Sequence, residues 1–363
     1  MYLALRDIRF AKGRFVLMGS VVTLISLLLV MLSGLTAGLA NQSTSSIDEL
    51  DADTVAFATS GPDDAEASYT DSRVTSAELQ SWEASEHVAA AEPLGITQTQ
   101  LDHEGTMNVA VFGADPGRSL APDALSAGGV VISEEIAEDL GIREGDAVQI
   151  STVELTVSEI IEDQWYSHSP VVWVSLADWQ EVSHLADEEI LGTVIAASHV
   201  ESSSVTDRDQ ERAEVDAAAG TLSMSPTESF SALASYSSEN GSLMMMQGLL
   251  YGISALVILA FLSVWTVQRT RDIAVLRALG ASQSYVLTDA IAQALVVLLA
   301  GALAGGGLGV VGGVLAGQAA PFITDASTTV IPVLGVVILG LAGSVLAVRR
   351  VTRVDPMLAL GGT

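Results

Sequence analysis

The sequence predicts a membrane protein with four transmembrane α-helices and one large mixed α/β extracytoplasmic domain inserted between helices 1 and 2. Of the 363 residues, 49% are hydrophobic, yet the formal net charge is −29, and one soluble body does not carry both on its surface. Four apolar stretches reach the length of about 20 residues that a bilayer-crossing helix needs. The acidic residues are concentrated between the first two stretches.

Hydropathy sets the predicted boundaries of these helices. The first stretch follows four basic residues, so a cleaved signal peptide is the alternative to a retained anchor. Its apolar core is roughly twice the 7–15 residues of the hydrophobic region of a signal peptide, which favours the anchor. The predicted spans are 15–40, 243–267, 285–318 and 330–348. They are separated by the outer domain 41–242, an inner loop 268–284 and an outer loop 319–329. An N-terminal segment 1–14 precedes the first span, and a tail 349–363 follows the last.

The distribution of charge predicts the orientation. Ten of the 15 lysines and arginines flank helix ends on one side, and the positive-inside rule makes that side cytoplasmic. Both termini are therefore predicted to be cytoplasmic, in a multi-pass protein of the cell membrane. The segment 41–242 carries five arginines against 39 of the 44 acids, a balance of −34. This acidity argues against binding to nucleic acid or to anionic lipid.

The outer domain shows both strand and helix patterns. Alternating runs at 54–58 and 108–112 predict strands. Residues 128–150 predict a strand, then a helix capped by Ser133 and ended at Gly141, then a turn and a second strand. The polar stretch 201–220 predicts a surface helix.

Catalytic signatures are missing from this sequence. It has no cysteine, so disulfides and thiolate metal sites are excluded. The five histidines stand at no metal-binding spacing, no Gly-x-Ser-x-Gly elbow occurs, and paired acids such as Glu134 and Glu135 are typical of a solvated face. The sequence predicts a non-catalytic subunit with no metal and no cofactor of its own.

The third span carries a glycine at every fourth position. Residues four apart share one helix face, so another backbone can approach this face closely. Asp289 is the one acid in a predicted span; interfacial placement or pairing with an arginine competes there with a proton relay. The glycines of the stripe are Gly301, Gly305, Gly309, Gly313 and Gly317.

Soft and aromatic side chains gather near the outer ends of spans 1 and 2. Methionines are commonly adaptable packing residues. The alternative is a ligand pocket, because thioether and phenol groups can contact or ligate a flat amphiphile such as haem. The candidate substrate-binding residues are Met31, Leu35, Tyr236, Met244, Met245, Met246 and Tyr251.

The inner loop between spans 2 and 3 has a helical pattern of its own. In the stretch QRTRDIAVLRALGAS at 268–282, Ile273 and Leu276 share one face, Arg271 and Asp272 turn towards water, and Gly280 is a C-terminal stop. This short, mixed-charge helix on the positive side is suited to docking a soluble partner. The chain has a single lysine, Lys12, and no phosphate loop, so ATP would be bound by another chain.

This stretch resembles the coupling helix of ABC transporter permeases of the MacB and FtsX type. The N-terminal LALRDIR, the C-terminal VDPMLAL and the unit at 130–150 are similar to the same family. The resemblance implies a homodimer of permeases bound to two ATPase subunits that hold ATP and Mg²⁺. The residues it assigns to the ATPase contact are Arg269, Arg271, Asp272, Ile273, Leu276, Arg277 and Gly280.

Within that family, the length and the methionine-containing rim look most like the HrtB-type haem-efflux permeases of Gram-positive bacteria. The resemblance implies extrusion of haem, or of another amphiphile, from the membrane outwards. The alternative is a mechanotransmission permease that activates a cell-wall hydrolase, or moves a peptide, lipoprotein or antibiotic, without a transmembrane substrate path. A free-standing receptor or membrane enzyme leaves the short helix at 269–280 unexplained.

Overall fold

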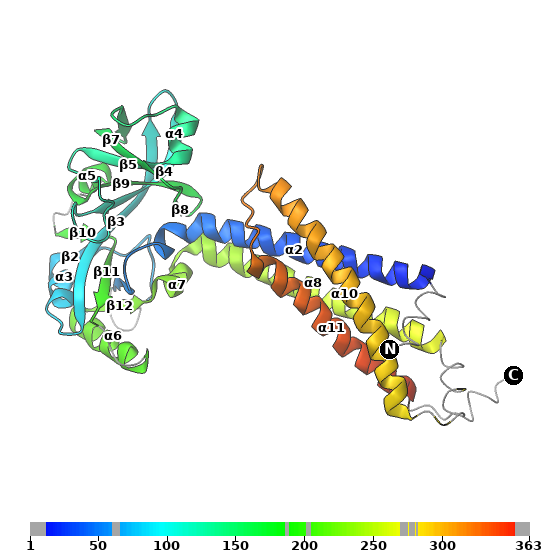
Figure 1. The fold of residues 1–363 in the computed structure, drawn as a ribbon. Coiled ribbons are helices and arrows are strands. Elements are labelled where there is room, and N and C mark those ends of the chain that lie inside the picture. The colour runs from blue at the N-terminus through cyan, green and yellow to red at the C-terminus, as the bar shows by residue number, and fades with distance from the viewer. Residues whose placement is uncertain are drawn as a thin grey trace. The chain divides into compact units, whose positions relative to one another are not determined.

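A computed structural model describes residues 12–59, 66–185, 189–200, 205–268, 275, 280 and 282–352. The chain divides into two compact units (Figure 1). The first, the membrane unit, comprises Met1–Leu39 and Gly241–Thr363; the second, the outer domain, comprises Ala40–Asn240.

Four long helices carry the apolar stretches: α2 (Lys12–Asp48), α8 (Ala234–Gln268), α10 (Gln283–Ala316) and α11 (Ala326–Thr352). Each contains a window long and apolar enough to cross a membrane. The prediction of four such helices, with a mixed α/β domain between the first and the second, is confirmed.

The first two helices extend further into the outer domain than their apolar stretches do. Helix α2 continues beyond residue 40 to Asp48, and α8 begins at Ala234, before residue 243. Hydropathy ends earlier because the last turns of α2 carry the polar run 43–46, which is buried within the outer domain. Ile47, in the same turns, is fully buried in the core of that domain.

The four helices of the membrane unit share one apolar core. Buried side chains from α2 (Val22, Leu29), α8 (Ile258), α10 (Leu298) and α11 (Val336) pack into a single cluster. The helices are buried to different extents, since the apolar window of α10 is 44% buried and that of α8 only 11%. Most of the apolar surface of α8 is therefore not covered by other parts of the chain.

The outer domain has two lobes that share one long strand. The first lobe is an antiparallel sheet in the spatial order β12 (Thr221–Met224), β1 (Thr54–Ala58), β11 (Val194–His199) and β3 (Val88–Asp102). The 15-residue β3 continues into the second lobe. One strand thus belongs to both sheets and joins the lobes.

Two helices and a small ribbon complete the first lobe. Helices α3 (Ser76–Glu83) and α6 (Val205–Ala219) pack on the sheet through Trp82 and Val215. A short ribbon pairs β2 (Val74–Thr75) with β10 (Ile190–Gly192). The chain leaves the lobe through α7 (Pro226–Ser229) and the 3₁₀ turn η1 (Phe230–Ala232) before α8 begins.

The second lobe is a closed barrel. The strand order is β3, β4 (Thr106–Ala114), β9 (Ser169–Ser175), β5 (Gly129–Ser133), β7 (Val153–Ile161) and β6 (Ala147–Ile150), and β6 pairs back onto β3. Closure removes free sheet edges. Strand β8 (Trp165–Tyr166) forms a hairpin with β9, and helices α4 (Glu134–Leu140) and α5 (Leu176–Val182) follow β5 and β9.

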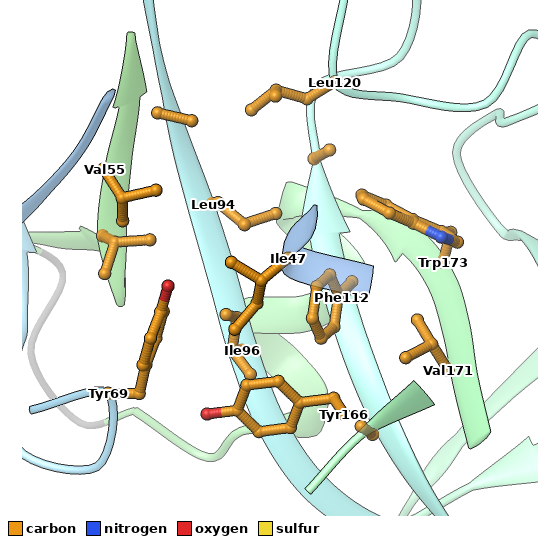
Figure 2. Packing of buried hydrophobic residues seen from close by; sticks show 14 of the residues in the cluster. Ile47, Val55, Tyr69, Leu94, Ile96, Phe112, Leu120, Tyr166, Val171 and Trp173 are labelled. Carbon is orange, nitrogen blue, oxygen red and sulfur yellow. The ribbon is translucent and has the colours of Figure 1, made fainter. Parts of the chain in front are cut away.

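Aromatic side chains fill the core between the lobes and the end of α2. Figure 2 shows Ile47 of α2 beside Phe112, with Tyr69, Tyr166 and Trp173 around them. The Phe112 ring meets the rings of Tyr166 and Trp173 edge to face, with centroids 5.5 and 5.2 Å apart. The outer end of α2 is therefore part of the hydrophobic core of the domain.

The predicted strand, helix, turn and strand unit at 128–150 is confirmed as β5, α4 and β6. Gly141 ends α4 in the left-handed conformation, with φ of 67°. The prediction that Ser133 takes the N-cap position of α4 is confirmed, but its side chain makes no capping hydrogen bond. The Ser133 Oγ is buried and has no hydrogen-bond partner among the described residues.

The carboxyl group of Glu135, in the first turn of α4, has a raised pKa. Partial burial is the main cause, and the negative charges of Asp163 and Asp139 add to it. The folded state therefore holds this proton more tightly than the unfolded state, so the stability of the folded state falls as pH rises through the folded pKa.

We expect Glu135→Gln to raise the melting temperature of the outer domain by about 1 °C at pH 7. The gain should vanish below pH 4.5, the ordinary pKa of glutamate. Tryptophan fluorescence of the purified full chain measures this unfolding, since Trp82, Trp165, Trp173 and Trp179, four of the five tryptophans, lie in the outer domain. Glu134→Gln, an exposed neighbour on the same helix, is the control and should give no gain. An equal gain for both variants, or a gain that persists in acid, would contradict the electrostatic cause.

Candidate functional site

Most of the predicted ATPase contact lies outside the described residues. This holds for Arg269, Arg271, Asp272, Ile273, Leu276 and Arg277. Gly280 is described: it is exposed and has φ of 95°, a left-handed conformation typical of a residue that ends a helix. Ser282 then caps α10, and its Oγ accepts a hydrogen bond from the Tyr285 amide at 3.2 Å.

The glycine stripe of α10 lies against α2. A Cβ added at Gly301 would stand 2.8 Å from the Val22 Cβ, and one at Gly309 would stand 2.7 Å from a Val30 methyl. At Gly305 the added atom would overlap the Thr23 carbonyl oxygen, which is backbone and has no rotamer to change. The two helices therefore approach each other so closely that these positions accept no side chain.

The outer end of the stripe meets the loop between α10 and α11. The Phe322 ring occupies the space that side chains at Gly313 on α10 and Gly34 on α2 would need. The Ile323 amide donates a hydrogen bond to the Gly34 carbonyl at 3.1 Å, and an added Cβ at Gly38 would overlap the Pro321 backbone. The loop is thereby wedged between the two helices. Gly317 differs from the other four stripe glycines, because it is exposed and its added Cβ would make only ordinary contacts.

The same loop starts α11 with a reciprocal cap. The Asp325 carboxylate accepts a hydrogen bond from the Thr328 amide at 2.6 Å, and the Thr328 hydroxyl accepts one from the Asp325 amide at 3.0 Å. The hydrogen bonds from Thr328 lower the pKa of the Asp325 carboxyl group. This cap fixes the position at which the chain turns back into the bundle.

Two of the candidate substrate-binding residues face neighbouring helices of the same chain. The Met31 sulfur lies 3.1 Å from the position of a Cβ added at Gly312 on α10. The Tyr251 ring packs over Gly335 of α11, 2.9 Å from the position of an added Cβ. Leu35 is half-buried on α2. These residues lie at helix contacts inside the membrane unit.

The methionine triplet is on the surface of the chain. Met244, Met245 and Met246 are 61, 76 and 51% exposed. An apolar stripe runs along α8 and comprises Met245, Leu249, Ile253 and Leu256. These residues are spaced by three or four positions, so they lie on one face of the helix, and each is at least half exposed. Tyr236, at the start of the same helix, belongs to the outer domain and packs edge to face on Phe230, with centroids 5.7 Å apart. Within the membrane unit, Met31 and Tyr251 therefore lie at helix contacts, whereas the methionine triplet is exposed.

Asp289 has an intrahelical partner. Its carboxylate accepts a hydrogen bond at 2.8 Å from the side-chain amide of Gln293, which is one turn further along α10 and fully buried. A hydrogen bond between residues four apart offsets part of the free-energy cost of placing a carboxylate in an apolar helix.

The histidines of the outer domain form hydrogen bonds to other groups of the same domain. His199 has Nε2 2.8 Å from the Thr54 hydroxyl, and Nδ1 3.3 Å from the His87 carbonyl oxygen.

Ser43, His168 and Glu239 have the composition of a catalytic triad but not its geometry. Both Ser43 Oγ and Glu239 Oε2 contact the same ring nitrogen, Nε2, at 3.2 and 2.8 Å. A triad needs the acid on the opposite nitrogen, so this group is not a nucleophile and base.

A cavity of about 310 Å³ opens in the first lobe. The Arg212 guanidinium contacts Asp209 at 2.7 Å and Glu228 at 3.8 Å, and Asp53 accepts a hydrogen bond from the His199 amide. The charged groups of the cavity thus already hold partners within the domain. The lining residues are Asp53, Thr54, His199, Asp209, Arg212, Ser225 and Glu228.

Sequence reasoning missed the contacts that join Ser43, His168 and Glu239. These residues lie more than 70 positions apart and share no motif, so the sequence offers no signal that connects them. The polar run 43–46 directly after an apolar span was a partial signal, because serine and threonine are unfavourable in lipid unless they have partners.

Two family models match the chain. A model of the MacB-like periplasmic core domain matches residues 17–218, and a model of the FtsX-like permease C-terminal region matches residues 244–356. Together they cover both units, and the first alone covers more than half of the chain.

Curated relatives match over the whole length. A Staphylococcus epidermidis protein named "Putative hemin transport system permease protein HrtB" is 24% identical over 366 residues, covering 100% of this chain and 99% of its own. An uncharacterised ABC transporter permease of Mycobacterium tuberculosis is 25% identical over 374 residues, with the same coverage. Among solved structures, the periplasmic region of MacB from Actinobacillus actinomycetemcomitans is 13% identical with a TM-score of 0.36, covering 50% of this chain and 92% of its own.

The glycine stripe yields a prediction with a control on the same helix. Gly305→Ala should destabilise the membrane unit by about 1–3 kcal/mol, because the added Cβ meets backbone of α2. Gly307→Ala should be neutral or stabilising by up to about 1 kcal/mol, since nothing lies within 4 Å of that position and alanine favours helix. Thermal unfolding and monodisperse yield in detergent measure both. Equal behaviour of the two variants would mean that the stripe does not hold α10 against α2.

Proposed function

The chain belongs to the ABC transporter permeases of the FtsX and MacB type, and on this basis we propose that it is the membrane subunit of an efflux transporter that exports haem or a similar flat amphiphile. ATP is bound and hydrolysed by a separate ATPase subunit. The observation that carries the proposal is the full-length match to permeases, including relatives named for hemin transport. Both termini, in this proposal, are cytoplasmic.

The exposed stripe of α8 supports a homodimer. An apolar window that is only 11% buried is covered either by lipid or by a second copy, and a second copy places its methionine triplet opposite the first. Met244, Met245 and Met246 from two chains then line a cavity at the level of the outer leaflet, with Met31, Leu35, Tyr236 and Tyr251 as the further candidate residues. Thioether sulfur is a ligand for haem iron, and apolar side chains accept the porphyrin faces.

The partner subunits dock, in this proposal, on the segment that precedes Gly280. Arg269, Arg271 and Arg277 supply charge for the ATPase surface, Asp272 supplies the opposite charge, and Ile273 and Leu276 supply an apolar contact. Two ATPase copies serve the two permeases. When ATP draws them together, the segments attached to α8 and α10 move with them, and the cavity between the α8 helices narrows and releases its ligand outwards.

A second candidate function is mechanotransmission without a substrate path through the membrane. Its supporting observation is that α2 and α8 continue without a break into the outer domain, where Ile47 is part of the core. The outer domain is then the working part, and it acts on an exported hydrolase, a peptide, a lipoprotein or an antibiotic. A stable complex with an exported protein, together with no ligand in the membrane, would favour this function.

Haemin titration of the detergent-purified permease, co-purified with its ATPase, tests the substrate. We expect a saturable Soret shift near one haem per dimer. Simultaneous substitution of Met244, Met245 and Met246 by leucine should weaken binding at least tenfold, because leucine keeps the apolar volume and removes the sulfur ligand. Leu303→Met, which adds a thioether at an exposed position of α10, is the control and should not strengthen binding. A titration no tighter than that of detergent alone would exclude haem and favour mechanotransmission.

Charge reversal tests the docking segment. Arg271→Glu with Arg277→Glu should reduce permease-stimulated ATP hydrolysis at least tenfold, because two favourable contacts become repulsive. The melting profile of the permease should stay unchanged. The matched control reverses Arg143 and Arg118 of the outer domain, which should leave hydrolysis unaltered. Unchanged stimulation in the Arg271 and Arg277 variant would place the ATPase contact elsewhere.

A further inference from the structure

The tip of the β8–β9 hairpin contacts both helices that lead to the membrane unit. Its two turn residues are Ser167 and His168, and we call this turn with its helix partners the clasp. On α2, the Gln42 and Ser43 carbonyls accept hydrogen bonds from the His168 and Ser167 amides at 2.9 and 3.0 Å. All residues of the clasp belong to the outer domain.

Side chains of the same two residues reach α8. The hydroxyl oxygens of Ser167 and Ser235 lie 2.9 Å apart. The His168 Nε2 lies 2.8 Å from the Glu239 carboxylate and 3.2 Å from the Ser43 hydroxyl. A carboxylate accepts hydrogen bonds only, so Nε2 carries the proton and donates it towards Glu239. One imidazole therefore bridges α2 and α8.

The polar run of α2 attaches the base of the hairpin. The Trp165 amide donates to the Ser45 hydroxyl at 2.8 Å, and the Ser46 hydroxyl donates to the Trp165 carbonyl at 2.9 Å. The Gln164 side chain donates to the Glu49 carboxylate at 2.8 Å. The hairpin is thus bound to α2 along the helix, whereas its hydrogen bonds to α8 come from the side chains of the two turn residues.

The backbone of the turn is unusual for its residue types. Ser167 and His168 have φ of 48° and 63°, the left-handed region that favours glycine or asparagine. A two-residue hairpin turn of type I′ has positive φ at both positions, as observed here. Glycine would satisfy this requirement without strain, yet serine and histidine stand there, and their side chains make the contacts with α8.

We propose that the clasp fixes α2 to α8 so that the outer domain follows the two helices as one lever, with His168 as the positioning residue. This inference rests on the proposed function, because it concerns how movement driven by the ATPase reaches the outer domain. Helix α2 is about 55 Å long and α8 about 52 Å, and an unbroken helix transmits displacement along its axis. The clasp stays closed throughout the transport cycle, and without it the two helix ends are held together only through their packing on the domain core.

The absence of cysteine from the chain allows a direct test with a reversible bond. His168→Gly removes the imidazole and keeps the turn, since glycine adopts positive φ freely. In the full permease and ATPase complex, reconstituted in liposomes, this variant should keep its ATP hydrolysis within twofold and lose at least fivefold in haemin exported per ATP. Adding Ser167→Cys and Ser235→Cys to the variant should restore export when the disulfide forms, and a reductant should abolish it again.

A substrate-independent measurement separates this inference from the proposed function. Spin labels at Asn41→Cys on α2 and Ser237→Cys on α8, both exposed, report the distance between the two helix ends. With His168 present the distance distribution should be narrow and equal with and without ATP. In His168→Gly it should broaden or shift with ATP. If haem is not the substrate, export is absent from the unsubstituted protein too, while the label distances still test the clasp.

His184→Gly is the matched control. His184 also has a left-handed φ, 52°, and its Nε2 lies 3.1 Å from the Ser151 hydroxyl, but it contacts neither α2 nor α8 through any bond that the described residues make. Export and label distances should not change in it. Three results would overturn the inference: unchanged export and distances in His168→Gly, loss of export when the disulfide forms beside an intact His168, or equal effects of His184→Gly.

Discussion

The membrane unit depends on direct contact between the backbones of α10 and α2. Inside a bilayer, apolar side chains gain nothing by leaving lipid for another helix, so close packing has to supply the attraction. Glycines at 301, 305 and 309 remove the side chains that would separate the two helices. Gly313 and Gly34 then leave room for the Phe322 ring. The short loop and the Asp325 cap fix where α11 begins. The packing of α2, α10 and α11 therefore depends on the glycine face of α10.

The outer domain obeys a different requirement, because water surrounds it and no disulfide supports it. Its stability comes from buried apolar side chains, from the closure of the barrel by β6 on β3, and from the aromatic contacts around Phe112. The end of α2 takes part in this core through Ile47 and in the surrounding polar contacts through its serines. The last turns of α2 are therefore part of the core of the outer domain, and the clasp binds to these same turns.

The sequence predicts what depends on composition and on near neighbours in the chain. The four apolar spans, the inserted domain and the unit at 128–150 follow from hydropathy and capping patterns, and the glycine stripe follows from spacing. Features that join distant residues do not: the pairing of Leu101 with Ile150 that closes the barrel, and the bridge from Ser43 through His168 to Glu239, leave no local pattern. The hydropathy pattern also predicted that α2 ends at residue 40. Hydropathy identifies the apolar stretch that suits lipid and does not show whether the helix continues beyond it. The candidate substrate-binding residues were grouped by their expected depth in the membrane, which does not show that Met31 and Tyr251 face neighbouring helices of the same chain.

The wedged loop has a consequence for assembly. Gly34 and Gly38 are four residues apart on α2, and in an apolar helix this spacing is the common signature of self-association between two identical helices. Here Phe322 and Pro321 of the same chain already fill that notch. A second molecule would have to expel the loop, and with it the hydrogen bond from Ile323 to Gly34, before the two notches could meet. The loop thus covers a small-residue surface that could otherwise pair with another helix, and the largely exposed α8 window remains as apolar surface for lipid or a second copy.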